Sequence, residues 1–534
     1  MQQLDTDVLV VGRGISGLMA AWRAAKGGQR VLVVGLGGGG SGWLQGCNVA
    51  LGHADPNDSV DAHVDDILKE GCGLNDPGLV RDTVENAVLG FYELVELGVP
   101  FARDGDRFLQ RRASGSRFAR SCFVERVMWG PESSGILQTA LKSRDVAIER
   151  LRLVRLVEIE GGVVGAIAFV PSTGEVVAIR CKATILASGG VGALYSHSTY
   201  PSDVNGSSYA IGFYAGASLV DMEFIQFEPL VGRNPPPLRG YAFPTTLFAD
   251  GAVLRDRSGN RFLDRDGRNE RSIGKEEMVR EMAALSERNA TIDGSGVWFD
   301  LTALSEADVR KYKWLDQIFT KHRIDFTKSL IDIWPAAHSC LGGLVVDRKR
   351  QTSVQGLFAV GEAAAGMHGA GHLAAGSGTD VLGSGYIGGD AAAAYAKQRD
   401  PLPWPGIIRA ASKMLSLESL TASDSGTYSD IVDHAEEILS RTAGLNRTGP
   451  ELQKGLNELK QLYDDIAADE PLHPASARLA LLDRILISGM ILNGALRRQE
   501  SRGAHLRKDY PQRSSAFDRN TPVTWCRESP FVDA

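Results

Sequence analysis

The sequence predicts an α/β protein that carries an inserted α+β domain and a helical C-terminal domain. Near the N-terminus, a buried strand, a glycine turn, a helix and a second buried strand follow one another, which is the pattern of a βαβ unit opening a parallel sheet. Residues 231–333 change character, with prolines, a dense charged stretch and tryptophans. From residue 399 onward, amphipathic helical periodicity prevails. A chain of 534 residues is expected to form several domains.

The first unit consists of two short apolar strands joined through a glycine turn and a helix. Val8–Val11 and Val31–Val34 contain only valine and leucine, which is typical of strands buried on both faces. The turn Gly12–Gly17 leads into a helix expected over Leu18–Ala25. Because a helix connects them, the two strands are expected to run parallel.

The middle of the chain alternates between helical and strand patterns. Helical periodicity predicts helices over Val60–Glu70 and Leu79–Leu97. A stretch rich in valine, isoleucine and glycine predicts an antiparallel meander over Leu153–Val177, followed by a buried strand at Ala183–Ala187. Strand and glycine signals resume after the inserted segment, from His338 to Gly389.

The C-terminal part is expected to be helical. Amphipathic patterns predict helices over Tyr428–Arg441, Glu451–Ile466 and Ala475–Arg498. The tail from Lys508 onward is polar and aromatic, so we expect it to lie along the surface.

Composition narrows the classes of function. Hydrophobic residues make up 43% and charged residues 23% of the chain, and the net charge is −7, so nothing suggests the basic face of a nucleic-acid-binding protein. Neither a signal peptide nor an uninterrupted apolar run of membrane-spanning length is visible, so we expect a cytoplasmic protein without a direct membrane span. Six cysteines without a CxxC pair are expected to be reduced thiols and not ligands of a metal or iron–sulfur site: Cys47, Cys72, Cys122, Cys181, Cys340 and Cys526.

The turn Gly12–Gly17 fits the GxGxxG pattern of dinucleotide-binding proteins. The first glycine makes the tight turn, the second lets the backbone approach a pyrophosphate, and the third lets helix and strand pack closely. The helix N-terminus supplies N–H groups and the positive end of a dipole for the phosphates. The acidic residue that usually ends the second strand and binds the ribose is missing, because Gly35 occupies its position.

Later blocks resemble a known family. Thr184–Gly190 resembles the TxLATGG segment of FAD-binding proteins. The GDG, RAGA and DMEFxQF elements of succinate dehydrogenase flavoproteins resemble Asn205-Gly206, Tyr214–Ala217 and Asp221–Phe227, respectively. Gly356–Ala363 is similar to GLFAAGEA, and Glu500–Pro511 to ESRGAHxRxDYP. From about residue 5 to 515 the chain therefore resembles the succinate dehydrogenase, fumarate reductase and L-aspartate oxidase flavoproteins.

The resemblance implies a two-dinucleotide-binding, Rossmann-like FAD domain, an inserted capping domain, and hydride transfer between a small-molecule substrate and flavin N5. The expected parts are 1–230 and 334–398 for the FAD domain, 231–333 for the capping domain, and 399–534 for the C-terminal helical domain and tail. Related dehydrogenases attach FAD through a histidine, which the equivalent run Ser41–Cys47 lacks, so FAD is expected to bind noncovalently. The expected cofactor-binding residues are Gly12, Gly14, Ile15, Ser16, Gly17, Ser41, Gln45, Gly46, Ala187, Ser188, Gly189, Asn205, Gly361, Glu362, Ser377, Gly378 and Thr379.

The substrate pocket departs from the family, in which histidine, threonine and arginine side chains bind a dicarboxylate and an arginine relays a proton. The QFHPT block reads Gln226–Leu230, which puts Glu228 where a carboxylate-binding histidine stands. The histidine of the HYxMGG block is retained as His338. The clamping arginine is replaced by His372, and the catalytic arginine corresponds to Lys275.

These four residues are the expected catalytic group, and they predict a changed substrate. The Glu228 carboxylate would repel a substrate carboxylate, and His372 cannot clamp one bidentately as arginine does. We therefore expect that succinate and fumarate are poor substrates. A cationic or hydroxylated group would face Glu228, while Lys275, His338 and His372 bind an anion or move protons. Three of these residues also have an alternative role without catalysis. Glu228 could be a buried, hydrogen-bonded structural residue that points away from the flavin, His372 could fill space beside the flavin, and Lys275 could be a solvated charge of the capping loop.

Three functions fit these observations. The first is an enzyme that oxidises or reduces a C–C or C–N bond of a small polar substrate. The second is a flavoprotein subunit that passes electrons to a separate iron–sulfur partner, with the tail Pro511–Ala534 as docking surface. The third is a flavin-binding module without catalytic activity.

Overall fold

The computed structural model describes residues 1–113, 115–125, 128–288, 291, 295–310, 312–417, 429–468 and 475–520. The last part of the expected tail, residues 521–534 with Cys526, lies outside the described residues. The other five cysteines are free thiols.

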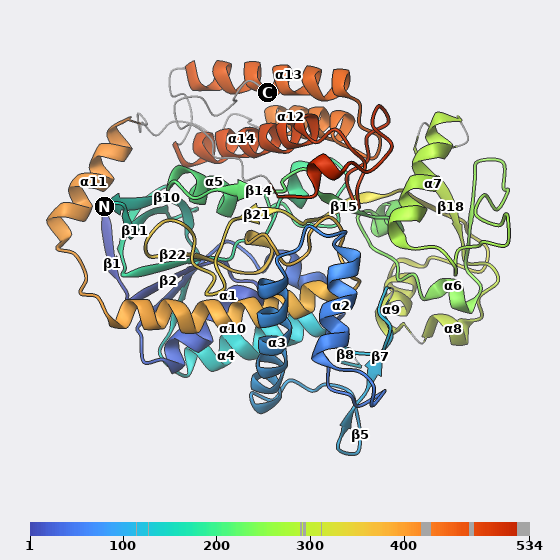
Figure 1. The fold of residues 1–534 in the computed structure, drawn as a ribbon, viewed down its shortest axis with the longest axis horizontal. Helices are drawn as coiled ribbons and strands as arrows, with labels where there is room; N and C mark the ends of the chain where they lie inside the picture. Colours follow the sequence, from blue (N-terminus) through green and yellow to red (C-terminus); the bar gives the residue numbers. More distant parts are fainter. Residues whose placement is uncertain are drawn as a thin grey trace.

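A parallel sheet forms the centre of the N-terminal part (Figure 1). Its strand order is β22-β13-β2-β3-β9, and every neighbouring pair runs parallel. The strands β2 (Val8–Val11) and β3 (Val31–Val34) are buried, and the helix α1 (Ile15–Lys26) connects them and packs against the sheet. The predicted βαβ unit is confirmed. The other strands of the sheet are β9 (Ala147–Glu149), β13 (Ala183–Leu186) and β22 (Leu357–Ala359).

An antiparallel layer packs on this sheet. The strands β10 (Arg152–Ile159), β11 (Gly162–Phe169) and β12 (Val176–Arg180) form the predicted meander, and β1 (Gln2–Asp5) pairs parallel with β12. Side chains of both sheets share one hydrophobic core, to which Leu9 of β2 belongs.

Further elements surround the two sheets. The predicted helix α2 is confirmed, and α3 begins and ends close to its predicted limits. The bounds are α2 Val60–Glu70, α3 Pro77–Glu96, α4 Trp129–Lys142, α5 Ser207–Tyr214, β4 Gly46–Asn48, β5 Arg103–Asp104, β6 Arg107–Phe108, β7 Gln110–Arg111, β8 Ser121–Phe123, β14 Leu219–Val220, β15 Ile225–Glu228, β20 Ala336–Cys340 and β21 Gly343–Leu344.

The helix α10 corrects one expectation. Residues Gly376–Lys397 form a helix of 22 residues where strand and glycine signals were expected. A Cβ added at Gly383 would lie 2.0 Å from the carbonyl oxygen of Thr83 in α3, and one at Gly389 would lie 2.4 Å from that of Ala20 in α1. The glycines therefore let α10 pack on the backbones of two other helices. A local pattern does not reveal this, because glycine disfavours helices unless tertiary contacts require it.

The inserted segment has its own hydrophobic core, seen at the right of Figure 1. This core runs from Leu230 to Ile333 and includes Phe243 and Phe299. The predicted domain limits of 231–333 stay a prediction. The bounds are β16 Gly232–Asn234, β17 Val253–Arg255, β18 Val297–Asp300 and β19 Ile331–Ile333, in the sheet order β16-β19-β18-β17, with α6 Leu247–Asp250, α7 Lys275–Glu287, α8 Glu306–Arg310 and α9 Lys313–His322.

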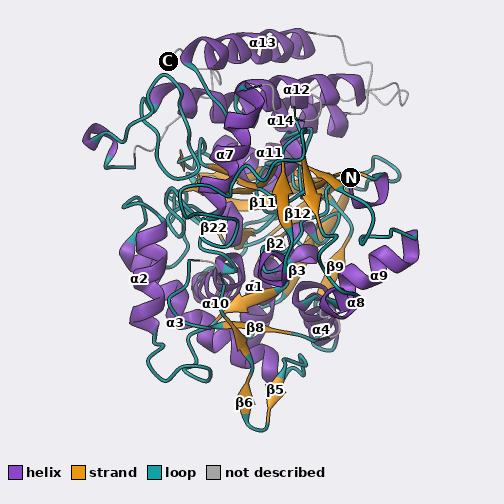
Figure 2. Cartoon of the chain, turned by 90° about the vertical axis from the view of Figure 1, so that its right-hand side faces the viewer, coloured by secondary structure: helices purple, strands orange, loops and turns teal. Residues whose placement is uncertain are grey.

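The C-terminal helices stack above the sheets in Figures 1 and 2. The helices α12 (Ser429–Thr442), α13 (Gly449–Ala468) and α14 (Ala475–Arg497) confirm the three predicted helices, and α11 (Trp404–Leu417) precedes them. Among the described helices, α14 has the length and mean hydropathy of a membrane span, but 83% of that window is buried inside the fold. It lies between α13 and α5, as the central helix of this part.

Buried ion pairs join the C-terminal part to the rest of the chain. Arg498 pairs with Glu223 and with Glu500, the latter at 3.1 Å, and Arg502 pairs with Glu500 at 2.7 Å. Nη1 of Arg447 donates to the carbonyl oxygen of Glu223 at 2.7 Å. Because each of these buried charges has a partner, the block resembling ESRGAH forms a structural junction.

The tight packing at Gly12 generates a stability prediction. Gly12 has φ +131°, and an added Cβ would lie 2.1 Å from the carbonyl oxygen of Ala187. Gly12→Ala should lower the free energy of unfolding by about 2–5 kcal/mol, because strain and overpacking add. Thermal unfolding measures this loss. Gly135→Ala is the matched control, because an added Cβ there meets no atom within 4 Å. An unchanged melting temperature for Gly12→Ala would contradict the prediction.

Candidate active site

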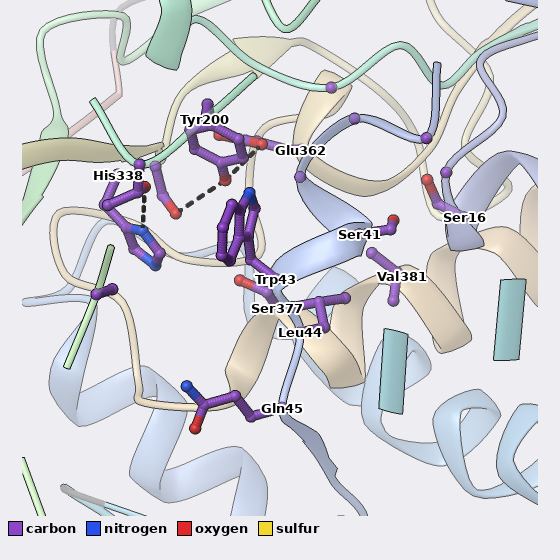
Figure 3. Close-up of a pocket in the computed structure, with 18 of the residues that line it drawn as sticks. Ser16, Ser41, Trp43, Leu44, Gln45, Tyr200, His338, Glu362, Ser377 and Val381 are labelled. Carbon is purple, nitrogen blue, oxygen red and sulfur yellow. Dashed lines mark hydrogen bonds between the residues drawn. The ribbon is translucent and has the colours of Figure 1, made fainter. Parts of the chain in front are cut away.

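A cavity of about 470 Å³ lies between the N-terminal part and the inserted segment. Its size is that of a site for a small molecule or cofactor. One wall is formed by the glycine turn after β2, the glycine run after β3 and the end of β13, and the opposite wall includes Tyr241 and Lys275 of the inserted segment. Figure 3 shows Trp43, Tyr200, His338 and Glu362 around this space.

The glycine turn has the geometry of a phosphate cradle. The N–H group of Ile15, the first residue of α1, donates to Oγ of Ser41 at 2.9 Å. A Cβ at Gly14 would lie 2.9 Å from the same Oγ, and one at Gly17 would lie 2.3 Å from the carbonyl oxygen of Gly12. The turn, the helix N-terminus and the Ser41 loop therefore meet with no room for side chains at these glycines, as a bound pyrophosphate requires.

Most of the predicted cofactor-binding residues line the cavity. These are Gly12, Gly14, Ser16, Ser41, Gln45, Gly46, Ala187, Ser188, Gly189, Asn205, Glu362 and Ser377. The other five do not line it: Ile15, Gly17, Gly361, Gly378 and Thr379. Thr379, for example, donates to the carbonyl oxygen of Asn48 at 2.8 Å, which anchors α10 to β4.

The four predicted catalytic residues all line the cavity. Glu228 is the last residue of β15, and Lys275 is the first residue of α7. Nζ of Lys275 lies 2.5 Å from Oε2 of Glu228. The Glu228 side chain is only 5% exposed, so this largely buried ion pair connects α7 of the inserted segment to β15.

Both predicted histidines are held by hydroxyl groups. Nδ1 of His338 lies 2.8 Å from Oγ1 of Thr199, and Nε2 of His372 lies 2.7 Å from Oγ of Ser377. Burial lowers the pKa of His338, and burial together with nearby His368 lowers the pKa of His372 well below its ordinary value. The imidazoles are therefore neutral near pH 7 and do not act as fixed cations.

Glu362 is the most connected carboxyl group of the cavity. The Tyr200 hydroxyl donates to Oε2 at 3.0 Å (Figure 3). The Cys340 N–H donates to Oε1 at 2.9 Å. A Cβ at Gly190 would lie 2.3 Å from Oε1, so that glycine makes room for the carboxyl group. Burial raises the pKa of Glu362 to about 7.

Several residues of the site were not found from the sequence. Thr199 and Tyr200 come from a loop without a recognisable pattern, and the Tyr200 ring stacks on His338 with centroids 5.9 Å apart. Gln226 donates to Glu276 of α7 at 2.8 Å, which adds a second link to the inserted segment. The ring centroid of His368 lies 4.5 Å from that of His372. His368 precedes His372 by four residues, so the sequence could have indicated it.

The residues present fit FAD. The cradle at the α1 N-terminus suits a pyrophosphate, and Glu362 and Asn205 line the same cavity as the cradle and the histidines. Space is open at Gly38 and Gly42, where an added Cβ would meet no atom within 4 Å. Among the described residues, no group of three or more histidine, cysteine or carboxylate side chains is arranged to hold a metal ion.

Glu362 generates a pH prediction for the FAD-free protein. Its pKa rises from an ordinary 4.5 to about 7 on folding, so the folded state binds more protons between these values. The free energy of unfolding should therefore fall as pH rises through this window. Glu362→Gln should remove this loss and gain up to about 3 kcal/mol over the wild type above pH 7.

Melting temperatures at pH 5 and pH 8 measure the difference between the two proteins. Glu306→Gln, at an exposed carboxyl group, should follow the wild-type curve. A Glu362→Gln protein that gains nothing at pH 8 would show that burial does not raise this pKa.

Comparisons with known proteins identify the family of this chain. A family model described as FAD binding domain matches residues 7–377, and one described as fumarate reductase flavoprotein C-term matches residues 433–531. The L-aspartate oxidase of Mesorhizobium japonicum is 32% identical over 533 residues, covering 95% of this chain and 92% of that protein. A fumarate reductase (CoM/CoB) subunit of Methanothermobacter marburgensis is 27% identical over 547 residues, covering 99% of this chain and 98% of the Methanothermobacter protein.

A solved structure shares the fold of this chain. The FrdA chain of E. coli quinol fumarate reductase superposes with a TM-score of 0.88 at 22% identity, and the match covers 99% of this chain and 96% of that chain. The protein is an FAD-dependent oxidoreductase with an FAD-binding domain and a C-terminal helical domain. The chain belongs to the flavoprotein family that contains the fumarate reductase flavoproteins and the L-aspartate oxidases.

Proposed function

We propose that this enzyme transfers a hydride between flavin N5 and a C–C or C–N bond of a small polar substrate other than succinate or fumarate. The bound FAD supplies the redox chemistry, and the protein supplies orientation, charge and a path for protons. FAD is held noncovalently, because the run Ser41–Cys47 contains no histidine that could form the covalent link.

The observation that carries this proposal is the charge balance among the four predicted catalytic residues. Lys275 and Glu228 neutralise each other at 2.5 Å, and burial keeps His338 and His372 uncharged near neutral pH. This group therefore carries no excess positive charge. A dicarboxylate would need fixed cations in this place to offset the loss of its hydration.

The same residues suit a substrate with an amine, hydroxyl or carbonyl group. An amine or hydroxyl group can donate to Glu228 when it enters beside Lys275, and the histidines can accept a proton from a bond that is being oxidised. Lys275 orients the Glu228 carboxylate, because its Nζ and the carboxylate oxygen are within hydrogen-bonding distance. Thr199 and Ser377 fix the orientation of His338 and His372.

Anaerobic visible spectra test the proposal. The flavin band of the holoprotein should stay unchanged with succinate or L-aspartate, and it should bleach with at least one member of a panel of small amines and monocarboxylates. Bleaching by succinate would contradict the proposed pocket. A flavin that no member of the panel reduces, and that none reoxidises after reduction with dithionite, would contradict the proposed reaction.

Paired variants sharpen this test. Glu228→His together with His372→Arg supplies the residues that the family resemblance implies for dicarboxylate binding, so the double variant should gain bleaching by succinate. Glu228→Gln is the matched control, because it removes the carboxylate without supplying a clamp, and it should gain no response. If the double variant behaves as Glu228→Gln does, these two positions do not select the substrate.

A second candidate function is that of a flavoprotein passing electrons to a separate iron–sulfur partner. The Methanothermobacter relative, which is itself named as one subunit of a fumarate reductase, matches over 99% of this chain and supports this possibility. Copurification from the native source followed by an iron assay tests it. A complex with iron and a second polypeptide would support this function, whereas a single polypeptide without iron would exclude it.

A further inference from the structure

The adenosine end of the cofactor cavity lacks its usual acidic residue. In dinucleotide-binding folds, a carboxylate after the second strand accepts hydrogen bonds from the ribose hydroxyls. Here β3 ends at Val34 and Gly35 follows, with the Gly35 backbone N–H donating to the carbonyl oxygen of Glu149 at 3.2 Å. Gly35 lines the cavity but has no side chain to offer.

The Arg13 side chain lies across this position. A Cβ added at Gly35 would lie 3.1 Å from Cγ and 3.4 Å from Cδ of Arg13. Arg13 also lines the cavity, because it is the second residue of the glycine turn at the α1 N-terminus. The arginine therefore fills the space beside Gly35 that the side chain of an acidic residue would enter.

Arg13 has hydrogen-bonding capacity that the protein leaves unused. Its Nε atom is buried and has no hydrogen-bond partner among the described residues. Because Nε itself is covered by protein atoms, the terminal nitrogens of the guanidinium group are the donors that a ligand in the cavity would meet. Arginine presents its donors in a planar fork, which matches two neighbouring oxygen atoms.

We infer that Arg13 holds the adenosine ribose of FAD, with the guanidinium group donating to the ribose hydroxyl oxygens in place of the missing carboxylate. Arg13 is thus a cofactor-binding residue that contacts the adenosine half of FAD and favours FAD over FMN. The inference concerns FAD binding alone and does not depend on the substrate proposed above.

Among the other charged residues that line the cavity, Asp203 and Arg152 are the competitors for this role. A Cβ at Gly37 would lie 2.4 Å from Oδ2 of Asp203, so this carboxylate lies further along the glycine run that leads to Ser41 and the phosphate cradle. Arg152, at the start of β10, lines the cavity as well, and burial lowers its pKa. Arg13 is favoured because it alone of the three packs on Gly35.

Titration of the FAD-free protein with FAD and with FMN tests the inference through flavin fluorescence. FMN lacks the adenosine half, so Arg13→Ala should raise the Kd for FAD about 10- to 100-fold and leave the Kd for FMN unchanged. Arg13→Gln keeps two amide donors and should lose less FAD affinity. Its FAD and FMN affinities also provide a second test if Arg13→Ala does not fold. Arg310→Ala, at an exposed arginine of α8, is the matched control and should change neither value.

A rescue variant adds a readout that general destabilisation would not produce. Gly35→Glu combined with Arg13→Ala supplies the usual carboxylate in the space that Arg13 vacated, so FAD affinity should recover while FMN affinity stays constant. Equal losses for FAD and FMN in Arg13→Ala, or no loss for either, would overturn the inference. A selective loss of FAD affinity in Asp203→Asn or Arg152→Ala, with none in Arg13→Ala, would assign the ribose to that residue instead.

Discussion

Contact between backbones around Gly12 determines where the cofactor cavity can form. The turn after β2 lies so close to the end of β13 that a single Cβ at Gly12 would overlap the Ala187 carbonyl group. The start of α1 is thereby pressed against the sheet, with its N-terminal end directed at the cavity. The Ser41 loop then closes on the same helix end through the Ile15 N–H. The other walls of the site are arranged around this fixed corner.

The electrostatics of the cavity around the four predicted catalytic residues follows from burial. Deep in the fold, an isolated charge is unfavourable, so charged groups pair and titratable groups take their neutral form. Lys275 and Glu228 satisfy this rule as an ion pair, and His338 and His372 satisfy it as neutral imidazoles. The ion pair also spans the contact between α7 and β15, so it links the position of the inserted segment to the electrostatics of the cavity.

The fold was predictable from the sequence where local pattern and tertiary structure agree. β2 and β3 match their predicted limits, because short continuous runs of valine and leucine next to a glycine turn are typical of strands buried on both faces. α10 was missed, because its glycines are required by close contacts with neighbouring helices, whereas glycine has a low helix propensity. The candidate site shows the same division. Motif-borne residues such as Glu362 line the cavity, whereas Tyr200 lies in an irregular loop whose position depends on distant contacts.

The glycines of α10 also have a consequence for folding kinetics. A helix with so many glycines has little helical content as an isolated segment, so it can form only when α1 and α3 already offer their backbones. Those helices come from the first hundred residues, and α10 begins at residue 376, so the contacts that complete the N-terminal part are very distant in sequence. Such contacts slow folding. During synthesis, the N-terminal half must wait for most of the chain before its core is closed, and its unfinished face stays exposed to chaperones in the meantime.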